Sequence, residues 1–361
     1  MPRPIYAEID LRALEHNLEI LREKAQGRDV WAVVKANAYG HGLENAVVAF
    51  AKADGLATID LLDAKRARDY GWTKRILLLE GFFDRDDIEP LQELDVETII
   101  HSPWQIAILK EMSLRKVRVH IKVNSGMNRL GFLPIEVNRV WKQLQNIDGV
   151  RVMGVVTHFA NAEPTYQANG PATVQRQMTR MGRWGQEGAA ACMANSAGIL
   201  WHPEVTGDAV RAGVALYGAS PDSHIRRSEL NIIPAMTLAA KIIAIQQIAA
   251  GRAVGYGSRW VAKRASRIGV VACGYADGYP RTMPDGAPVW VNGRIAPIAG
   301  AVSMDMLAID ITDFPDVDVG TRVELWGKNL PVNQVAAACG TIGYELLCAL
   351  ARRVPIVVKS E

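Results

Sequence analysis

The sequence lacks the marks of several protein classes. It has 361 residues but only four cysteines, at positions 192, 273, 339 and 348, and their spacing matches no metal site. We therefore expect reduced thiols in a cytoplasmic protein, and no bound metal. Charge of one sign is also scarce, because 41 Lys and Arg face 38 Asp and Glu and leave a formal net charge of +3. This balance gives no reason to expect a nucleic-acid or membrane partner.

Long apolar runs are absent as well. The amino terminus is mixed in charge and has no apolar core of a signal peptide. The most apolar later stretch, 232–250, is interrupted by Lys241, Gln246 and Gln247, which argues against a membrane span. With 49% hydrophobic and 22% charged residues, the composition is that of a chain with a large folded core.

Short apolar, β-branched runs alternate with longer amphipathic stretches in the first two-thirds of the chain. Eight runs are strand candidates: 30–34, 56–59, 75–79, 96–100, 117–123, 152–157, a short run at Met193, and 210–214. The helical stretches between them include 43–52, 103–112, 135–145 and 172–185. Eight alternating strands predict a parallel (β/α)8 barrel. A doubly wound open sheet is the alternative, but no Gly-rich dinucleotide turn follows an early strand.

The pattern changes after Pro221. From Ile232 onward the chain shows short strands and turn segments such as GRAVGYG, DGAP and VNGR. Helical signals return only at 332–339 and 345–351. We place a boundary within 222–233 and predict an α/β protein with a (β/α)8 barrel at 1–225 and a mostly β domain at 226–361.

Polar residues recur at the carboxyl ends of the predicted barrel strands. Lys35, Lys122, His158 and Ser196 each lie at or just beyond such an end, and Arg129 follows shortly after Lys122. In a barrel these ends converge on the face that carries the active site. Lys35 could simply extend its charge to the surface, but the glycines that follow it permit a close approach to a ligand. A lysine in such a cleft can form a Schiff base with an aldehyde cofactor.

The segment around this lysine, VKANAYGHG at 34–42, resembles the cofactor-lysine signature of the alanine racemases, a barrel-type class of pyridoxal-phosphate enzymes. Other segments fit the same family in its order: KVNSGMNRLGF (122–132), THFAN (157–161), NSAG (195–198), RAGVALYG (211–218), GYG (255–257), GYADGYPR (274–281), GAVSMD (300–305) and GYE (343–345). The resemblance spans nearly the whole chain and both predicted domains.

The resemblance implies pyridoxal 5′-phosphate as the cofactor, with Lys35 as the Schiff-base lysine. The groups implied to hold the phosphate are Tyr39, Ser196, the backbone of Gly213 and Val214, and Tyr344. Barrels often bind phosphate after strands seven and eight, which agrees with this placement. Arg211 would face the pyridine nitrogen and, because it cannot give up its proton, would limit carbanion delocalisation and disfavour transamination. A surface ion pair is the alternative for Arg211.

The resemblance also implies a substrate site. Arg129 would contact the substrate carboxylate, Met304 would add its backbone N–H, and Tyr275 would form an entrance gate with Tyr344. The supporting residues are Lys122, which could carry a carbamate, and Asp305. Simpler alternatives are a core side chain for Met304, a structural role for His158 and a solvent-facing amine for Lys122.

Racemisation requires two bases on opposite faces of the α-carbon, and we assign Lys35 and Tyr256 to them. A phenol has a pKa of about 10 and needs cationic or hydrogen-bonding help as a base, which His158 and Arg211 could supply. The family's head-to-tail homodimer would bring Tyr256 to the partner's barrel. The substrate would be alanine. The alternatives are a racemase of broader specificity, a decarboxylase, which Arg129 and Met304 argue against, and a non-catalytic cofactor-binding protein.

Overall fold

The computed structural model describes residues 3–167, 170–185, 190–205, 207–225 and 227–359. The chain forms two compact units. The barrel unit comprises Glu15–Ala38 and Gly42–Leu216, and the β unit comprises Met1–Leu14, Tyr39–His41 and Tyr217–Glu361. Residue 226, at which the sequence predicts the second domain to begin, lies outside the described residues.

Eight parallel strands of the barrel unit close on themselves, which confirms the predicted (β/α)8 barrel. They are β2 (Asp29–Val33), β3 (Gly55–Thr58), β4 (Arg75–Leu78), β5 (Glu97–Ile100), β6 (Val117–Lys122), β7 (Val150–Val156), β8 (Ala191–Cys192) and β9 (Ala209–Ala212). Pairing of Trp31 in β2 with Arg211 in β9 closes the ring and rules out an open doubly wound sheet. Most strand positions are buried, as the near-continuous apolar runs of these segments require.

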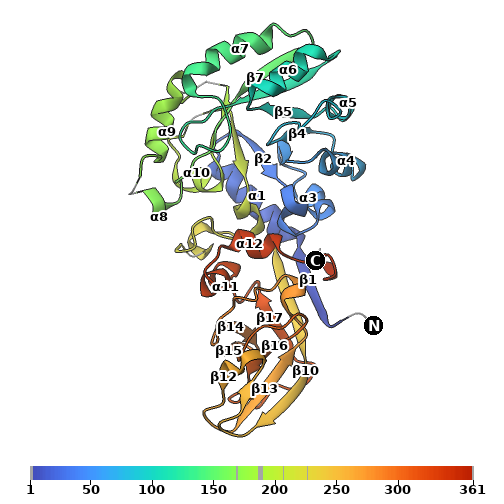
Figure 1. Ribbon diagram of the computed structural model, residues 1–361, viewed down its shortest axis with the longest axis vertical. Coiled ribbons are helices and arrows are strands. Elements are labelled where there is room, and N and C mark those ends of the chain that lie inside the picture. Colours follow the sequence, from blue (N-terminus) through green and yellow to red (C-terminus); the bar gives the residue numbers. More distant parts are fainter. Residues whose placement is uncertain (1–2, 168–169, 186–189, 206, 226, 360–361) are drawn as a thin grey trace. The chain divides into compact units, whose positions relative to one another are not determined.

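Helices surround the strands (Figure 1). They are α3 (Leu43–Ala49), α4 (Leu61–Asp69), α5 (Ile88–Glu93), α6 (Pro103–Glu111), α7 (Val137–Gln145), α8 (Pro164–Gln167), α9 (Val174–Met181) and α10 (Ser196–Trp201), and α1 (Leu11–Lys24) leads into the unit. Helix α7 shows why these segments pack as helices against the strands: its buried residues Val137, Val140 and Leu144 recur at helical spacing and form one apolar face. Within the described ranges, no helix is both long enough and apolar enough to span a bilayer.

The β unit is mostly β, as predicted. Its strands are β1 (Ile5–Asp10), β10 (Met236–Ile248), β11 (Ala253–Val254), β12 (Trp260–Val261), β13 (Ser266–Val271), β14 (Pro288–Val291), β15 (Arg294–Pro297), β16 (Leu307–Asp310), β17 (Arg322–Trp326) and β18 (Ile356–Lys359). Its helices α11 (Val332–Ala338) and α12 (Gly343–Cys348) lie where helical signals return.

Strand β1 departs from the predicted division of the chain. The range 1–225 assigned to the barrel includes this strand, but β1 pairs antiparallel with β10 and parallel with β18 in the β unit. Its buried residues Ile5, Ala7 and Ile9 alternate with more exposed ones, which is typical of a strand that buries one face. The division at 225 remains a prediction.

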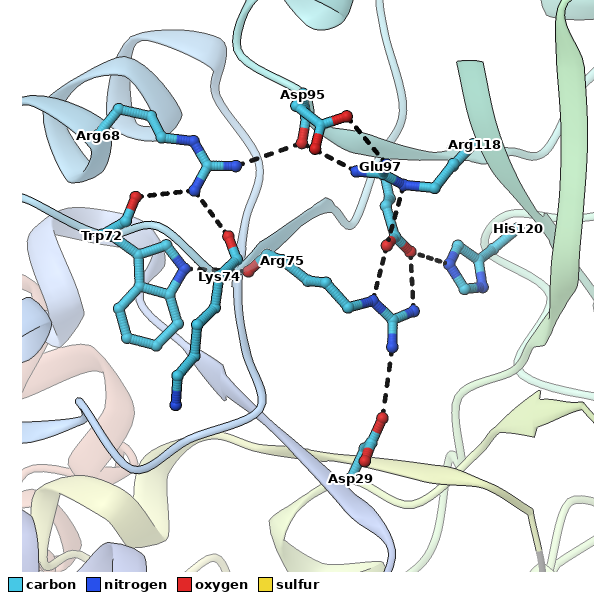
Figure 2. A network of polar contacts seen from close by, with 9 residues as sticks. All are labelled: Asp29, Arg68, Trp72, Lys74, Arg75, Asp95, Glu97, Arg118 and His120. Carbon is cyan, nitrogen blue, oxygen red and sulfur yellow. Dashed lines mark hydrogen bonds and ion pairs between the residues drawn. The ribbon is translucent and has the colours of Figure 1, made fainter. Parts of the chain in front are cut away.

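A polar network occupies the amino ends of the barrel strands (Figure 2). Glu97, whose side chain is 1% exposed, accepts hydrogen bonds from Arg75 Nε (2.7 Å) and Nη2 (3.0 Å). His120 Nε2 lies 2.7 Å from its Oε2, and Arg118 Nε lies 3.3 Å from its Oε1. Burial works to raise the pKa of Glu97, but the His120 and Arg75 contacts outweigh it and lower the pKa to about 2. Groups at this end of a barrel serve stability rather than catalysis.

Candidate active site

Lys35 lies at the start of a left-handed turn, α2 (Lys35–Tyr39), directly beyond β2. The next four residues all have positive φ: Ala36 (55°), Asn37 (52°), Ala38 (54°) and Tyr39 (51°). A left-handed conformation costs an L-residue roughly 1–2 kcal/mol, so this run concentrates strain beside the lysine. Strain of this kind gathers at ligand-binding sites, where the surrounding structure maintains it. The sequence KANAY contains no glycine and therefore does not predict this left-handed conformation.

Cationic groups converge at the carboxyl ends of the barrel strands. Lys122 ends β6 and is 9% exposed. Burial first, and then the charges of Arg211 and Arg129, lower its pKa to about 7. His158, just beyond β7, has a pKa well below its usual value because of burial and then the charges of Arg211 and Lys122. The structure therefore brings Lys122, Arg129, His158 and Arg211 together, with Lys35 close enough to contribute to both shifts.

Arg211 is buried among neutral acceptors. It is 4% exposed, and its Nη1 donates to the Cys192 carbonyl (2.6 Å) and lies 3.1 Å from the Cys192 sulfur. Its Nη2 donates to the carbonyls of Thr157 (2.6 Å) and Met193 (3.3 Å) and lies 3.4 Å from His158 Nδ1. The surface ion pair considered for this arginine is wrong, because the guanidinium is inside the barrel.

In the part of the chain that the structure describes, Lys35, Lys122, Arg129 and Arg211 form no ion pair with a carboxylate. Arg129 lines a hollow of about 410 Å³ together with His101 and other residues of the surrounding loops. Lys122 and Arg211 are buried, Lys35 is partly exposed and Arg129 is exposed. An anionic ligand would stabilise the two buried charges.

Ser196 and Gly213 meet beyond β8 and β9, the seventh and eighth strands of the barrel. The side chain of Asn195, not that of Ser196, caps α10 by accepting a 2.9 Å hydrogen bond from Gly198 N. Instead, Ser196 Oγ accepts from the backbone N–H of Gly213 (2.8 Å) and Ala215 (3.4 Å). Val214, between them, is fully buried. A hydroxyl and backbone N–H groups thus gather where barrels often bind phosphate.

An aromatic cluster in the β unit contains two more of the predicted residues. The Tyr39 ring stacks on Tyr217, with centroids 4.7 Å apart, and lies 6.2 Å from the ring of Tyr344 on α12. Burial raises the pKa of both Tyr39 and Tyr217, which keeps their hydroxyls neutral hydrogen-bond donors. Tyr217 was not singled out from the sequence, where only its place in the RAGVALYG segment marked it.

Tyr256 projects from the surface of the β unit. It begins the short turn η5 (Tyr256–Ser258), and its residue is 72% exposed. The flanking Gly255 and Gly257 have φ values of 73° and 69°, which glycine adopts at little cost. Tyr256 is therefore not a packed hairpin aromatic but a phenol presented to its surroundings.

Tyr275 and Met304 lie on two neighbouring loops of the β unit. Their residues are 39% and 54% exposed, so Met304 is not the core filling considered as its alternative role. Backbone hydrogen bonds of 3.0 Å join Tyr275 N to Ser303 O and Ala276 N to Met304 O. The predicted supporting residue Asp305 follows directly in the second loop.

Comparisons with known proteins match both units. Residues 9–221 match the family described as "Alanine racemase, N-terminal domain", and residues 235–358 match "Alanine racemase, C-terminal domain". The alanine racemase of Erwinia tasmaniensis is 48% identical over 360 residues, covering 99% of each chain. The catabolic alanine racemase of Klebsiella aerogenes is 47% identical over 361 residues, again 99% of each. The biosynthetic alanine racemase of Pseudomonas aeruginosa has a similar structure, with a TM-score of 0.94 and 42% identity over 99% of each chain.

Proposed function

Because this chain belongs to the alanine racemase family, we propose that it interconverts L-alanine and D-alanine with pyridoxal 5′-phosphate as its cofactor. The family resemblance of its motifs is thereby confirmed. The observation that carries the proposal is the unpaired positive charge of Lys35, Lys122, Arg129 and Arg211 at one end of the barrel. A phosphorylated cofactor and an amino-acid carboxylate supply the negative charge that these groups lack.

The residues present fit this cofactor. When bound, pyridoxal phosphate supplies an aldehyde carbon for an amine and a ring that delocalises charge from the α-carbon. Lys35 would hold the aldehyde, and Arg211, fixed by three carbonyls, would donate a hydrogen bond to the ring nitrogen without transferring a proton. The proposed phosphate ligands are neutral donors: the Tyr39 and Tyr344 phenols, the Ser196 hydroxyl, and the Gly213 and Val214 backbone.

Two bases would move the proton. Lys35 would act on one face of the α-carbon and Tyr256 on the other, so that a proton removed from one side is replaced from the opposite side. Burial and the charge of Arg211 lower the pKa of His158, so its imidazole remains neutral. A neutral imidazole can form a hydrogen bond with the Tyr256 phenol. Arg129 and the Met304 N–H would hold the carboxylate, and Tyr275 with Tyr344 would guard the entrance.

We further propose that the working enzyme is a cytoplasmic homodimer in which Tyr256 serves the partner's barrel. The support is chemical: a phenol 72% exposed at a glycine-flanked turn needs a cationic environment to act as a base, and the barrel of a second copy supplies one. The four cysteines, none of them in a disulfide within the described chain, fit a reducing compartment.

The direct test is racemisation by the purified protein supplied with pyridoxal phosphate and L-alanine, followed by chiral chromatography. D-alanine should accumulate until both enantiomers are equal, and the Lys35→Ala variant should form none. L-serine in the same assay separates an alanine enzyme from one of broader specificity. Release of carbon dioxide with no D-alanine would establish a decarboxylase and overturn the proposal.

A further inference from the structure

A buried carboxylate of the β unit lies behind the Tyr275 loop. Asp277 ends the short turn η6 (Tyr275–Asp277), and its side chain is 0% exposed. Its Oδ2 accepts a hydrogen bond from Gly274 N (3.0 Å), while its Oδ1 accepts from Arg3 Nη1 (2.7 Å) and Arg353 Nε (2.8 Å). Two cations therefore compensate a carboxylate that water does not reach.

Arg353 binds a second carboxylate on the neighbouring loop. Its Nη2 donates to Asp305 Oδ1 at 2.6 Å while its Nε donates to Asp277. The planar guanidinium thus spans the Tyr275 loop and the Met304 loop with two bonds of fixed direction. Arg3 reinforces the bridge, because its Nη2 donates to the Asp305 carbonyl at 2.5 Å.

The two bridged loops are in direct contact. A Cβ added at Gly274 would lie 2.3 Å from Ser303 O and 2.4 Å from Met304 O, so the backbones touch with no space between them. The bonds from Tyr275 N and Ala276 N to the same two carbonyls continue this contact. The bridge and this backbone contact therefore act on the same two loop tips.

We infer that Arg353 is a positioning residue, which sets the distance between the Tyr275 gate and the Met304 N–H that receives the substrate carboxylate. The inference rests on the proposed function for the identity of the substrate, but the loop spacing itself does not. Arg353 acts through Asp277 and Asp305 and touches neither alanine nor the cofactor. Loss of the Arg353 side chain should weaken binding of the substrate carboxylate more than it slows proton transfer, because the proposed bases Lys35 and Tyr256 are unchanged.

Three variants of the holoenzyme test the inference: Arg353→Ala, Arg353→Lys and the control Arg352→Ala. Arg352 is an exposed arginine directly before Arg353 in the chain. Its replacement by alanine removes the same charge but leaves the bridge between Asp277 and Asp305 intact. Amide hydrogen exchange at Tyr275 and Ala276 should rise roughly 10-fold in both Arg353 variants, because lysine cannot span two carboxylates as a guanidinium does. The KM for both enantiomers should rise roughly 3- to 10-fold with kcat within about twofold, and Arg352→Ala should change neither quantity.

Three results would overturn the inference: unchanged amide exchange in Arg353→Ala, full rescue of exchange and KM by lysine, or a fall in kcat at constant KM. The first would show that the loops hold their spacing without the bridge, and the second that charge alone suffices. If the wild type fails to racemise alanine, the proposed function fails, but the amide exchange still decides whether Arg353 holds the loops.

Discussion

Replacing Glu97 with glutamine removes the charge at the centre of the network that closes the amino end of the barrel (Figure 2). Glutamine has nearly the same shape and keeps one acceptor oxygen for Arg75, but its NH2 group replaces the second acceptor, so the change removes the charge together with one acceptor. Arg75 and Arg118 then lose the buried carboxylate that both of them face. Breaking a buried pair by neutralising one partner is destabilising because it leaves a poorly solvated charge uncompensated.

The size of the effect follows from the pKa of Glu97, which falls from 4.5 to about 2 on folding. At about 1.4 kcal/mol for each tenfold change in the equilibrium, ionised Glu97 contributes about 3 kcal/mol to the free energy of unfolding at pH 7. Because folding depresses this pKa, the contribution is complete above pH 4.5 and is lost as the pH falls towards 2. About half of it or less should remain at about pH 3.

Urea unfolding of wild type and Glu97→Gln, followed by circular dichroism from pH 7 to pH 3, measures this difference. The control is Glu19→Gln, which neutralises the exposed Lys52–Glu19 ion pair (2.7 Å) and should leave the midpoint nearly unchanged. Equal stabilities of wild type and Glu97→Gln at pH 7 would refute the reasoning. So would a difference that stays constant as the pH falls.

Four further predictions concern the proposed active site. Borohydride reduction of the protein with pyridoxal phosphate, followed by peptide mapping, should find the label on Lys35, and a label elsewhere would contradict its role. Tyr256→Phe should lose α-proton exchange in heavy water far more from L-alanine than from D-alanine, whereas equal losses would argue against a phenol that serves one face. A heterodimer of Lys35→Ala and Tyr256→Phe chains has one native and one doubly defective composite site. If the two sites are independent, it should recover up to about half of the wild-type activity per dimer. An intact but inactive heterodimer would exclude shared sites. Lys122, whose pKa is about 7, should react as a neutral amine with carbon dioxide, giving a carbamate and a proton. The ¹³C signal from labelled bicarbonate should therefore grow as the pH rises through about 7 and be absent in Lys122→Gln.

Local patterns were sufficient to predict much of the fold. Each barrel strand is a short apolar run flanked by amphipathic helices, and burial on both faces leaves that mark within a few residues. Seven of the eight strand candidates overlap observed strands, with ends displaced by a few residues, and the short run predicted at Met193 lies directly after β8. Lys122, His158 and Ser196 could be assigned to one end of the barrel because parallel strands carry their carboxyl ends to the same face. Their chemical roles came from the family resemblance and remain predictions.

Contacts between distant segments were decided only by the tertiary structure. Arg3 and Asp277 are 274 residues apart, and Arg75 and Glu97 are 22 apart on strands whose polar first residues resemble ordinary strand ends. No local pattern specifies such partners, because the side chain of an arginine beside an apolar run could equally well extend into solvent. The left-handed run after Lys35 is hidden for a similar reason, since alanine and tyrosine rarely adopt this conformation unless surrounding contacts outweigh its strain. The sequence alone thus determined which segments become strands and which chemistry they carry, while packing decided which charges meet and how the reactive groups are held.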